Sequence, residues 1–378
     1  MSVSVKAVST SSELKKFIHF PFELYKDSPY WVPPILMDEK ETLSKKKNPA
    51  FKHASATYWL AYKGEKIVGR IAGILINAEV EDKKLARFGW IDFIDDEEVS
   101  RALINTVENW AQEQGIIGVH GPLGLSDMDP QGMLVEGFDS MATMATTYNY
   151  EYYPKHLKKL GYTSVAEWVE LTGDLSFEFD EKVYQRTNFI KERFGLEIAN
   201  TNSQKELAVH GFDIFNLINK TYQDLYGFHP LSNEQISYYV GKYLKFVRKE
   251  YTKYVLKDGK FVGFGIAMPS FSKALQKNRG RLFPFGWIQL LKAFMSDEEL
   301  DLYLISVEPE YAKLGVTRLL FFEIYNNFKK NGGKVFYTNP ILKSNTPSKN
   351  MFYSPKVDDK EIEIRKRRQC FIKEFSNE

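Results

Sequence analysis

The chain has 378 residues, of which 43% are hydrophobic and 26% charged, a composition typical of a globular protein long enough for two domains. The formal net charge of +2 gives no strong bias toward nucleic acid or membranes. Cys370 is the single cysteine, which excludes an intramolecular disulfide and a cysteine-based zinc cluster. Residues 1–16 lack the apolar stretch of a signal peptide, and no window reaches the roughly 20 apolar residues of a membrane span. We therefore expect a cytoplasmic protein.

The first predicted helix begins near the N-terminus. Ser11 or Ser12 can accept hydrogen bonds as its N-cap, and Pro21 is expected to end it. Further prolines exclude a regular helix after Asp27, so an extended aromatic and proline-rich segment follows.

The chain then repeats one order of elements twice. Each copy has an apolar strand, a glycine turn and a second strand that opens on Val-Gly, which predicts a β-hairpin. A strand, an amphipathic helix and another strand follow each hairpin. The first copy covers Trp59–Arg70, 90–94, 97–114 and 116–120, and the second covers Tyr254–Phe264, 302–307, 315–330 and 334–339. A unit of this length predicts two α/β domains of one fold, over residues 1–175 and 176–378, and not a solenoid.

The remaining segments are placed in chain order. The prediction is an irregular stretch over 121–153, a closing strand over 164–171, helices over 181–194, 212–225 and 234–246, a basic insertion over 273–292, a short helix over 344–353 and a last strand over 361–375. Within the insertion, the aromatic run Phe283–Ile288 is expected to cover the sheet, with a lid as the alternative.

The strongest chemical signal is the second strand-to-helix junction. A strand ends at Val307, Pro309 breaks it, and a loop passes through Gly315 into a leucine-rich helix. Such a turn directs free backbone N–H groups and the positive end of the helix dipole to one point. Glycine lets the backbone approach a ligand closely, so the junction predicts a pyrophosphate site.

This segment resembles the acyl-CoA-binding motif of the GNAT superfamily of acyltransferases, which runs Val-x-Pro, a Gln/Arg-x-x-Gly-x-Gly/Ala loop and a Leu-Leu helix. The likeness covers most of Tyr254–Tyr353, and a weaker one covers Trp59–Leu171. Through Trp31-Val-Pro-Pro and the loop from Gly121-Pro to Gly137-Phe-Asp, the whole chain also resembles bacterial tandem-GNAT proteins of poorly defined function. The implied fold is two GNAT-like α/β domains in tandem, each a mixed sheet flanked by helices.

The resemblance implies an acyl-CoA co-substrate, either acetyl-CoA or a longer one. It implies that Tyr353 protonates the leaving thiolate and that Glu308 acts as a base, and the alternatives are a tyrosine that only packs and a glutamate that is only solvated. The residues that it places along the co-substrate are Ser306, Val307, Gly315, Val316, Thr317, Arg318, Asn345 and Asn350. The two asparagines are as well suited to capping the turn.

Two departures from the motif affect the co-substrate. Ala312 stands at the Gln/Arg position and Thr317 at the second Gly/Ala position. In the first half, the corresponding junction has no glycine and carries the acidic run Asp95–Glu98. Carboxylates suit a helix N-terminus but repel phosphate, so the first domain is expected not to bind CoA there.

The long loop after the first copy is a candidate acceptor site, because long loops in compact domains are often functional. Four of its carboxylates are candidates to receive a cationic amine: Asp127, Asp129, Glu136 and Asp139. A purely structural loop is the alternative. The histidines show no metal-binding spacing, and no Ser-His-Asp elbow is present.

The sequence thus predicts an N-acyltransferase acting on a small-molecule or peptide amine. The first alternative is a tandem-GNAT binding protein without catalysis. The second is aminoacyl transfer from tRNA, which the basic run Ile364–Gln369 and the basic insertion permit. Nucleic acid is not expected as a partner, because the net charge is close to neutral.

Overall fold

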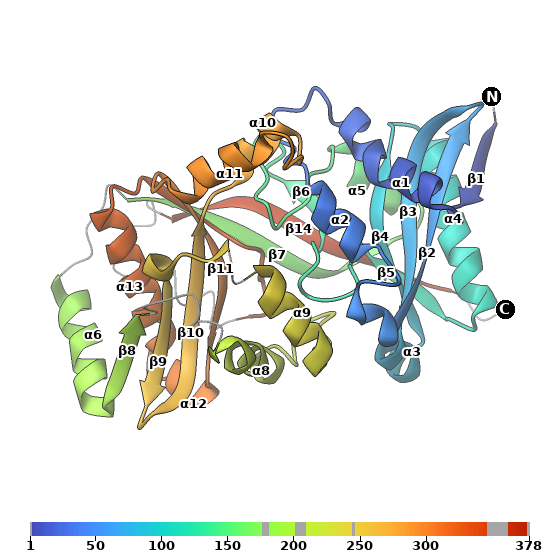
Figure 1. The fold of residues 1–378 in the computed structure, drawn as a ribbon. Helices are drawn as coiled ribbons and strands as arrows, with labels where there is room; N and C mark the ends of the chain where they lie inside the picture. The colour runs from blue at the N-terminus through green and yellow to red at the C-terminus, as the bar shows by residue number, and fades with distance from the viewer. Residues whose placement is uncertain (1, 176–180, 201–208, 244–245, 346–361, 376–378) are drawn as a thin grey trace. The chain divides into compact units, whose positions relative to one another are not determined.

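The computed structural model describes residues 2–175, 181–200, 209–243, 246–345 and 362–375 (Figure 1). Asn350, Tyr353 and most of the helix expected over 344–353 lie outside these residues. The chain divides into two compact units. Unit 1 comprises Met1–Trp168, Ser272–Trp287 and Lys366–Glu378, and unit 2 comprises Val169–Phe271 and Ile288–Arg365. Among the described residues, no helix has both the length and the apolar character to cross a bilayer.

Unit 1 is a mixed sheet with the strand order β1-β2-β3-β4-β5-β14, in which β4 and β5 run parallel and the other neighbours antiparallel. Its strands are β1 (Val3–Ala7), β2 (Ala54–Lys63), β3 (Lys66–Ile76), β4 (Leu85–Phe93), β5 (Gly118–Gly121), β6 (Met133–Glu136) and most of β14 (Ile362–Glu374). Its helices are α1 (Ser11–Leu24), α2 (Leu36–Thr42), a 3-10 turn (Pro49–Lys52), α3 (Asn77–Lys83), α4 (Glu97–Glu113), α5 (Tyr152–Lys159) and α10 (Ser272–Asn278).

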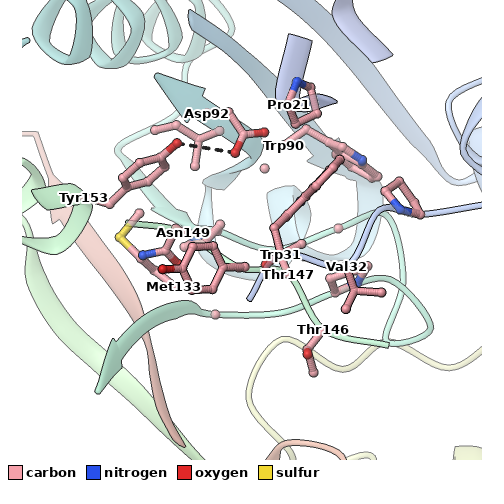
Figure 2. Close-up of a pocket in the computed structure, with 18 of the residues that line it drawn as sticks. Pro21, Trp31, Val32, Trp90, Asp92, Met133, Thr146, Thr147, Asn149 and Tyr153 are labelled. Carbon is pink, nitrogen blue, oxygen red and sulfur yellow. Dashed lines mark hydrogen bonds between the residues drawn. The ribbon is translucent and has the colours of Figure 1, made fainter. Parts of the chain in front are cut away.

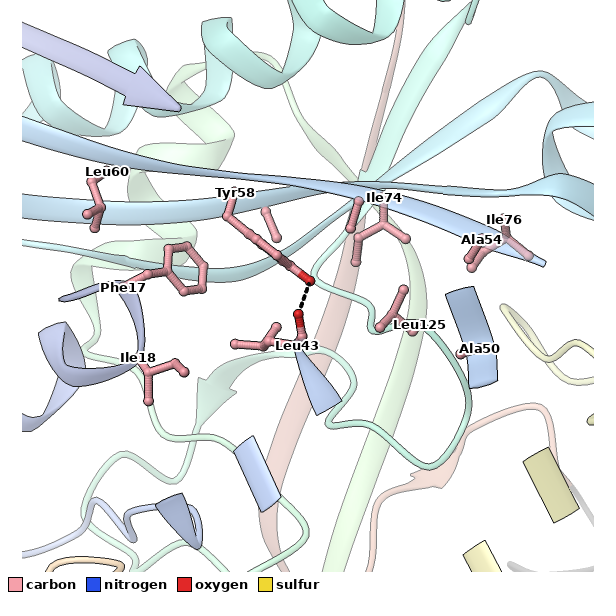
Figure 3. Packing of buried hydrophobic residues seen from close by; sticks show 12 residues of the cluster. Phe17, Ile18, Leu43, Ala50, Ala54, Tyr58, Leu60, Ile74, Ile76 and Leu125 are labelled. Carbon is pink, nitrogen blue, oxygen red and sulfur yellow. Dashed lines mark hydrogen bonds between the residues drawn. The ribbon is translucent and has the colours of Figure 1, made fainter. Parts of the chain in front are cut away.

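The alternation of β3 assigns the two faces of this sheet. Gly69 and Gly73 lie against α4, where a Cβ on Gly73 would stand 2.7 Å from the Trp110 ring. Ala72 and Ile74, on either side of Gly73, pack on the other face with Phe17 and Ile18 of α1 (Figure 3). Because side chains in a strand alternate between faces, β3 supplies one wall of each of two layers.

Unit 2 repeats this arrangement with the strand order β8-β9-β10-β11-β12-β7, in which β11 and β12 run parallel. Its strands are β7 (Thr163–Asp174, from Val169), β8 (Leu196–Asn200), β9 (Thr252–Lys257), β10 (Lys260–Pro269), β11 (Glu299–Val307), β12 (Val335–Thr338) and β13 (Ile341–Leu342). Its helices are α6 (Glu181–Phe194), α8 (Gly211–Thr221), α9 (Asn233–Tyr243), a 3-10 turn (Lys249–Tyr251), most of α11 (Gly286–Phe294), α12 (Pro309–Ala312) and α13 (Val316–Lys330).

The internal repeat is present in the register of the strands. Gly69 pairs with Phe93 in unit 1, and Gly263 pairs with Val307 in unit 2. The next residue along the chain also matches, since the N–H of Ile94 donates to Val68 O at 3.0 Å and the N–H of Glu308 donates to Val262 O at 2.8 Å. The predicted α/β fold with two copies of one mixed sheet is confirmed.

The closing strands do not stay with their own half of the chain. Strand β14, expected to close the second half, pairs with β5 through Phe371↔Gly121. Strand β7, expected to close the first half, pairs with β12 through Val335↔Asp174. The units therefore differ from the expected division at residue 175, because 272–287 and 366–378 belong to unit 1. The sequence patterns of hairpins and helices lie within short segments. The strand that a closing strand pairs with depends on contacts between residues far apart in the chain, which these patterns do not contain.

Some elements differ locally from those expected from the sequence. The N-cap of α1 is Thr10, in a capping box with Glu13, and the helix continues through Pro21 to Leu24. The stretch expected to be irregular over 121–153 contains β6, and α5 begins at Tyr152.

Candidate functional site

A cavity of about 110 Å³ lies in unit 1 where β4 and β5 separate (Figure 2). The two strands pair in parallel as far as Arg87↔His120 and then diverge. One wall is the end of β4 from Gly89 to Asp92, and another is the loop from Pro122 to Gly124. A Cβ on Gly89 would stand 2.4 Å from Leu123 O, so only glycine allows this approach of the two walls.

A bulge in β4 shapes the cavity. Arg70 pairs with Asp92 and Ala72 with Gly89, so Trp90 and Ile91 stand opposite the single residue Ile71. Trp90 has a φ of 44°, in the left-handed region that bulky residues seldom adopt. Its indole Nε1 donates to Glu39 Oε1 at 2.9 Å. Bulges are typical of strands that redirect a side chain beside a binding site.

A buried polar network forms the floor of the cavity. Arg70 Nε donates to Asp92 Oδ2 at 2.7 Å, and the hydroxyl of Tyr25 donates to Asp92 Oδ1 at 2.8 Å. The hydroxyls of Tyr25 and Tyr153 lie 2.7 Å apart, and the N–H of Phe93 donates to Tyr153 Oη at 3.0 Å. Burial first, and the charge of Asp92 second, raise the pKa of both tyrosines well above 10. Both phenols therefore keep their protons near neutral pH and can act as donors.

Pro21 explains how the network is held. Proline has no N–H, so it cannot make the helical hydrogen bond to the carbonyl four residues earlier, which belongs to Phe17. Arg70 Nη1 donates to that carbonyl at 3.0 Å. Helix α1 therefore continues past Pro21 to Leu24, because the Arg70 guanidinium replaces the missing donor. The expectation that Pro21 ends this helix is wrong. Pro21 itself lines the cavity.

The loop expected to bind the acceptor, within residues 121–153, does line the cavity, but its four candidate carboxylates do not take part. Pro122, Leu123, Gly124, Pro130, Gly132 and Met133 line the cavity, and the four proposed carboxylates do not. Asp129 accepts hydrogen bonds from the N–H groups of Leu125 and Ser126 at 2.8 and 3.0 Å and so shapes the loop.

The other three acids have separate surroundings. Asp127 accepts a hydrogen bond from Gln131 Nε2 at 2.5 Å, Glu136 pairs with Arg367 at 2.9 Å, and Asp139 is exposed. Burial raises the pKa of Asp127, opposed by its hydrogen bond to Gln131. Their role in receiving an amine stays a prediction.

Unit 2 carries the expected pyrophosphate junction. Gly315 is the N-cap of α13 with a φ of 92°, and a Cβ there would meet Ile190 Cδ1 only at 3.5 Å, so conformation and not space favours glycine. The N–H groups of Leu314 and Gly315, just after the short helix α12, donate back to Tyr311 O and Ala312 O of that helix at 3.0 Å, so neither is directed at a ligand. As in any helix, the first-turn N–H groups of α13 have no acceptor within the helix, and this turn begins at Val316 and Thr317.

Two positively charged side chains, Arg318 and Arg186, lie near this helix end. The pKa of Arg318 is lowered by burial and then by the positive charge of Arg186, which belongs to α6. Two guanidinium groups that repel each other beside a helix N-terminus favour an anion at that place.

Of the expected catalytic and pantetheine residues, Ser306, Val307 and Glu308 lie at the end of β11. The hydroxyl of Ser306 lies 2.6 Å from that of Thr221, and Val307 is buried. The carboxylate of Glu308 pairs with Lys220 Nζ at 2.5 Å. Asn345 donates its backbone N–H to Leu342 O at 2.8 Å. Ser306, Val307 and Glu308 are consecutive in the chain and lie directly before α12 and the turn into α13.

The corresponding helix end in unit 1 is occupied by a side chain. Asp96 caps α4 by accepting from the N–H groups of Glu98 and Val99 at 3.0 and 3.4 Å, and Lys63 Nζ pairs with it at 2.5 Å. Hydrogen bonding to Lys63 comes first among the causes that lower the pKa of Asp96. A carboxylate thus accepts the hydrogen bonds of these first-turn N–H groups, and the absence of CoA binding in this unit stays a prediction.

Sequence reasoning missed the cavity network. Asp92 and Arg70 each interrupt an apolar strand, in Trp90–Phe93 and in Val68–Ile71, and two opposite charges in neighbouring buried strands were the available signal. Tyr25 and Tyr153 gave none, because tyrosine is common in packed regions.

No known protein-family profile matches the chain. Among curated proteins, it is 29% identical to protein YghO of Escherichia coli (strain K12) over 360 residues, covering 92% of this chain and 90% of that one. It is 27% identical to the bacterial ceramide synthase of Caulobacter vibrioides (strain NA1000 / CB15N) over 295 residues, covering 76% of each chain.

Solved structures show the same architecture. A tandem GNAT protein from the clavulanic acid biosynthesis pathway matches with a TM-score of 0.56 and 11% identity over 100% of both chains. A GCN5-related N-acetyltransferase from Sphaerobacter thermophilus matches with a TM-score of 0.51 and 9% identity, covering 98% of this chain and 95% of that one. The chain therefore has the tandem GNAT fold.

Proposed function

We propose that the protein is an N-acyltransferase that moves an acyl group from an acyl-CoA to the nitrogen of an amine, with the donor bound at the β11–α13 junction of unit 2. The observation that carries the proposal is the start of the 15-residue helix α13 at the left-handed Gly315, because the first-turn N–H groups of a helix have no intrahelical acceptor and a glycine N-cap adds no side chain over them. Arg318 and Arg186 add positive charge there. Thr317, where the motif has a small residue, adds a hydroxyl that can donate to a phosphate oxygen.

The chemistry requires two proton movements. The neutral amine attacks the thioester carbonyl, so that a C–N bond forms and the C–S bond breaks. The nitrogen then loses a proton, and the thiolate of CoA gains one. In this proposal Glu308 accepts the amine proton through a water molecule, with Lys220 holding the carboxylate in place at 2.5 Å. Tyr353, assigned by resemblance, gives a proton to the thiolate.

The acceptor that we propose is a long-chain amine. The support is the likeness to a bacterial ceramide synthase, since ceramide is an N-acylated long-chain amino alcohol. Forming it is an amide-forming acyl transfer to nitrogen, which is the reaction that the sequence predicts. We propose a long-chain acyl-CoA as the donor for the same reason, in place of acetyl-CoA.

A second candidate function is supported by unit 1. Its α4 N-terminus is occupied by Asp96, yet it has a cavity with a buried polar floor and apolar walls. We propose that unit 1 binds a ligand without transferring an acyl group. If the junction in unit 2 is also inactive, the whole chain is the noncatalytic binding protein that the sequence allows as an alternative.

Thermal melting with CoA, acetyl-CoA and long-chain acyl-CoAs tests the donor site. A ligand at roughly 100 times its dissociation constant stabilises the fold by about 2.7 kcal/mol. Mass spectrometry after addition of long-chain amino alcohols then tests transfer. Stabilisation together with an amide product supports the enzyme, and stabilisation without any product supports the binding protein. No stabilisation by any acyl-CoA contradicts the proposal and leaves aminoacyl-tRNA as the donor to test.

A further inference from the structure

The segment 273–295, here called the basic apolar segment, differs from the rest of the chain in charge. It contains α10, a turn and α11, which follow each other in orange in Figure 1. It has no acidic residue, although acidic and basic residues are nearly balanced in the whole chain. Its basic residues are all exposed: Lys273, Lys277, Arg279, Arg281 and Lys292.

The same segment exposes large apolar side chains. Phe283, Phe285 and Met295 are each 71% exposed, and Trp287 and Leu291 are each 48% exposed. The expectation that this aromatic run covers the sheet is therefore wrong. Trp287, Leu291 and Met295 are spaced by four residues, so they form one face of α11 and its C-terminal end. Leu290, on another face of the helix, is buried.

The segment is held firmly at its N-terminal end within unit 1. Gln276 Nε2 donates to Pro29 O at 2.8 Å and to Trp31 O at 2.9 Å. Arg279 Nη2 donates to Phe22 O at 3.0 Å. Trp31 lines the cavity of unit 1, so these hydrogen bonds join α10 to the extended segment that contains Pro29 and Trp31 and forms part of the cavity wall.

The surroundings add positive charge. The pKa of His19 is lowered by burial and then by the positive charges of Lys15, Lys40 and Arg281. These basic groups come from α1, α2 and the turn before α11, so the positive potential extends beyond the segment itself.

We propose that the exposed face of the basic apolar segment binds the surface of an anionic lipid bilayer. Phe283, Phe285 and Trp287 enter the boundary between headgroups and acyl chains, and the basic side chains around them contact the lipid phosphates. Helix α11 exposes Trp287 and Leu291 and carries Lys292 as its only charge, and the turn before it adds Phe283 and Phe285. A segment with exposed apolar side chains and only basic charges is suited to lie in the membrane interface without spanning it. This site is separate from the acyl-CoA junction and does not depend on the proposed reaction.

Charge decides between a membrane and a second copy of the chain. In a symmetric dimer through this face, the basic residues of one copy would meet the same basic residues of the other, and like charges oppose association. An anionic bilayer satisfies the apolar and the basic groups together.

Flotation of the protein with lipid vesicles tests the proposal. We expect binding to phosphatidylglycerol-containing vesicles, little binding to pure phosphatidylcholine, and a loss of binding as salt rises from about 50 to about 500 mM. The triple variant Phe283→Ser, Phe285→Ser and Trp287→Ser should bind at least roughly tenfold more weakly. Phe189→Ser, which changes an exposed aromatic residue of α6, is the matched control and should bind as the wild type does.

Three results would overturn the proposal. They are no binding by the wild type, equal binding by the wild type and the triple variant, or a wild-type dimer in light scattering that the triple variant converts to monomer. Circular dichroism confirms the fold of each variant. If the triple variant is unfolded, Met295→Glu alone, at a side chain 71% exposed, should reduce binding in the same assay.

Discussion

Arg70 and Asp92 form an ion pair of 2.7 Å between neighbouring strands of unit 1, with both side chains at most 10% exposed. The pair joins three parts of the chain, because Arg70 also holds the carbonyl of Phe17 and Asp92 accepts the hydroxyl of Tyr25. Removing one charge from a buried pair leaves the other without its counterion, which is more destabilising than removing both.

Asp92→Ala should therefore lower the free energy of unfolding by about 3–5 kcal/mol. The double variant Arg70→Met with Asp92→Leu should recover much of that loss, because no unpaired charge remains. Urea unfolding followed by circular dichroism measures both. Glu151→Ala removes an exposed pair with Lys155 and should change stability by less than about 1 kcal/mol. An equal loss in the single and double variants would contradict the ion-pair account.

Gly315→Ala should weaken acyl-CoA binding. An alanine in the left-handed region destabilises the fold by about 1 kcal/mol or more and moves the first turn of α13. Gly332→Ala is a matched control, since Gly332 has a φ of 87° just past the other end of α13 and free space around its Cα. Both variants should melt at lower temperature, and only Gly315→Ala should reduce the thermal shift caused by acyl-CoA. The same reduced shift in both variants would mean that the effect is general destabilisation.

Asp301 should make unfolding depend on pH. Burial raises the pKa of this carboxyl to about 7, against a usual value near 4. The folded state thus binds more protons than the unfolded state between about pH 4 and pH 7, so its stability falls as pH rises through that range. Relative to the wild type, Asp301→Asn should gain stability with rising pH, by at most about 4 kcal/mol.

Urea unfolding of both proteins at several pH values gives this difference directly. Asp139→Asn, which changes an exposed carboxylate, is measured beside them as the control for the substitution itself. A difference between wild type and Asp301→Asn that stays constant with pH would mean that Asp301 ionises normally in the folded protein.

Strand β14 should be essential for the stability of unit 1. Phe371 is fully buried and pairs with Gly121 of β5, so Phe371→Ala should cost about 3–5 kcal/mol. Glu374→Ala, on the exposed end of the same strand, should have little effect. Hydrogen exchange of the β5 amides is the more specific measurement, and it should accelerate only in Phe371→Ala. Unchanged protection of β5 would show that its pairing does not need this side chain.

The local elements followed from the sequence alone. The hairpins around Gly64 and Gly259, the helix Glu181–Phe194 and the helix after Gly315 lie where turn chemistry and apolar periodicity place them. These signals are contained within about 20 neighbouring residues, so no distant contact is needed to interpret them. The same holds for the acidic junction at Asp95–Glu98, whose Asp96 caps its own helix.

Long-range contacts decided the rest. The exchange of β7 and β14 depends on which strand edge each one meets, and apolar alternation is the same for either partner. Pro21 is tolerated in α1 because Arg70, 49 residues later, supplies the missing donor. The buried polar network combines Tyr25, Asp92 and Tyr153, which are far apart in the chain and reach one point only after the strands have paired. The sequence by itself determined where the helices, strands and turns form, and only tertiary packing determined which of their polar side chains meet.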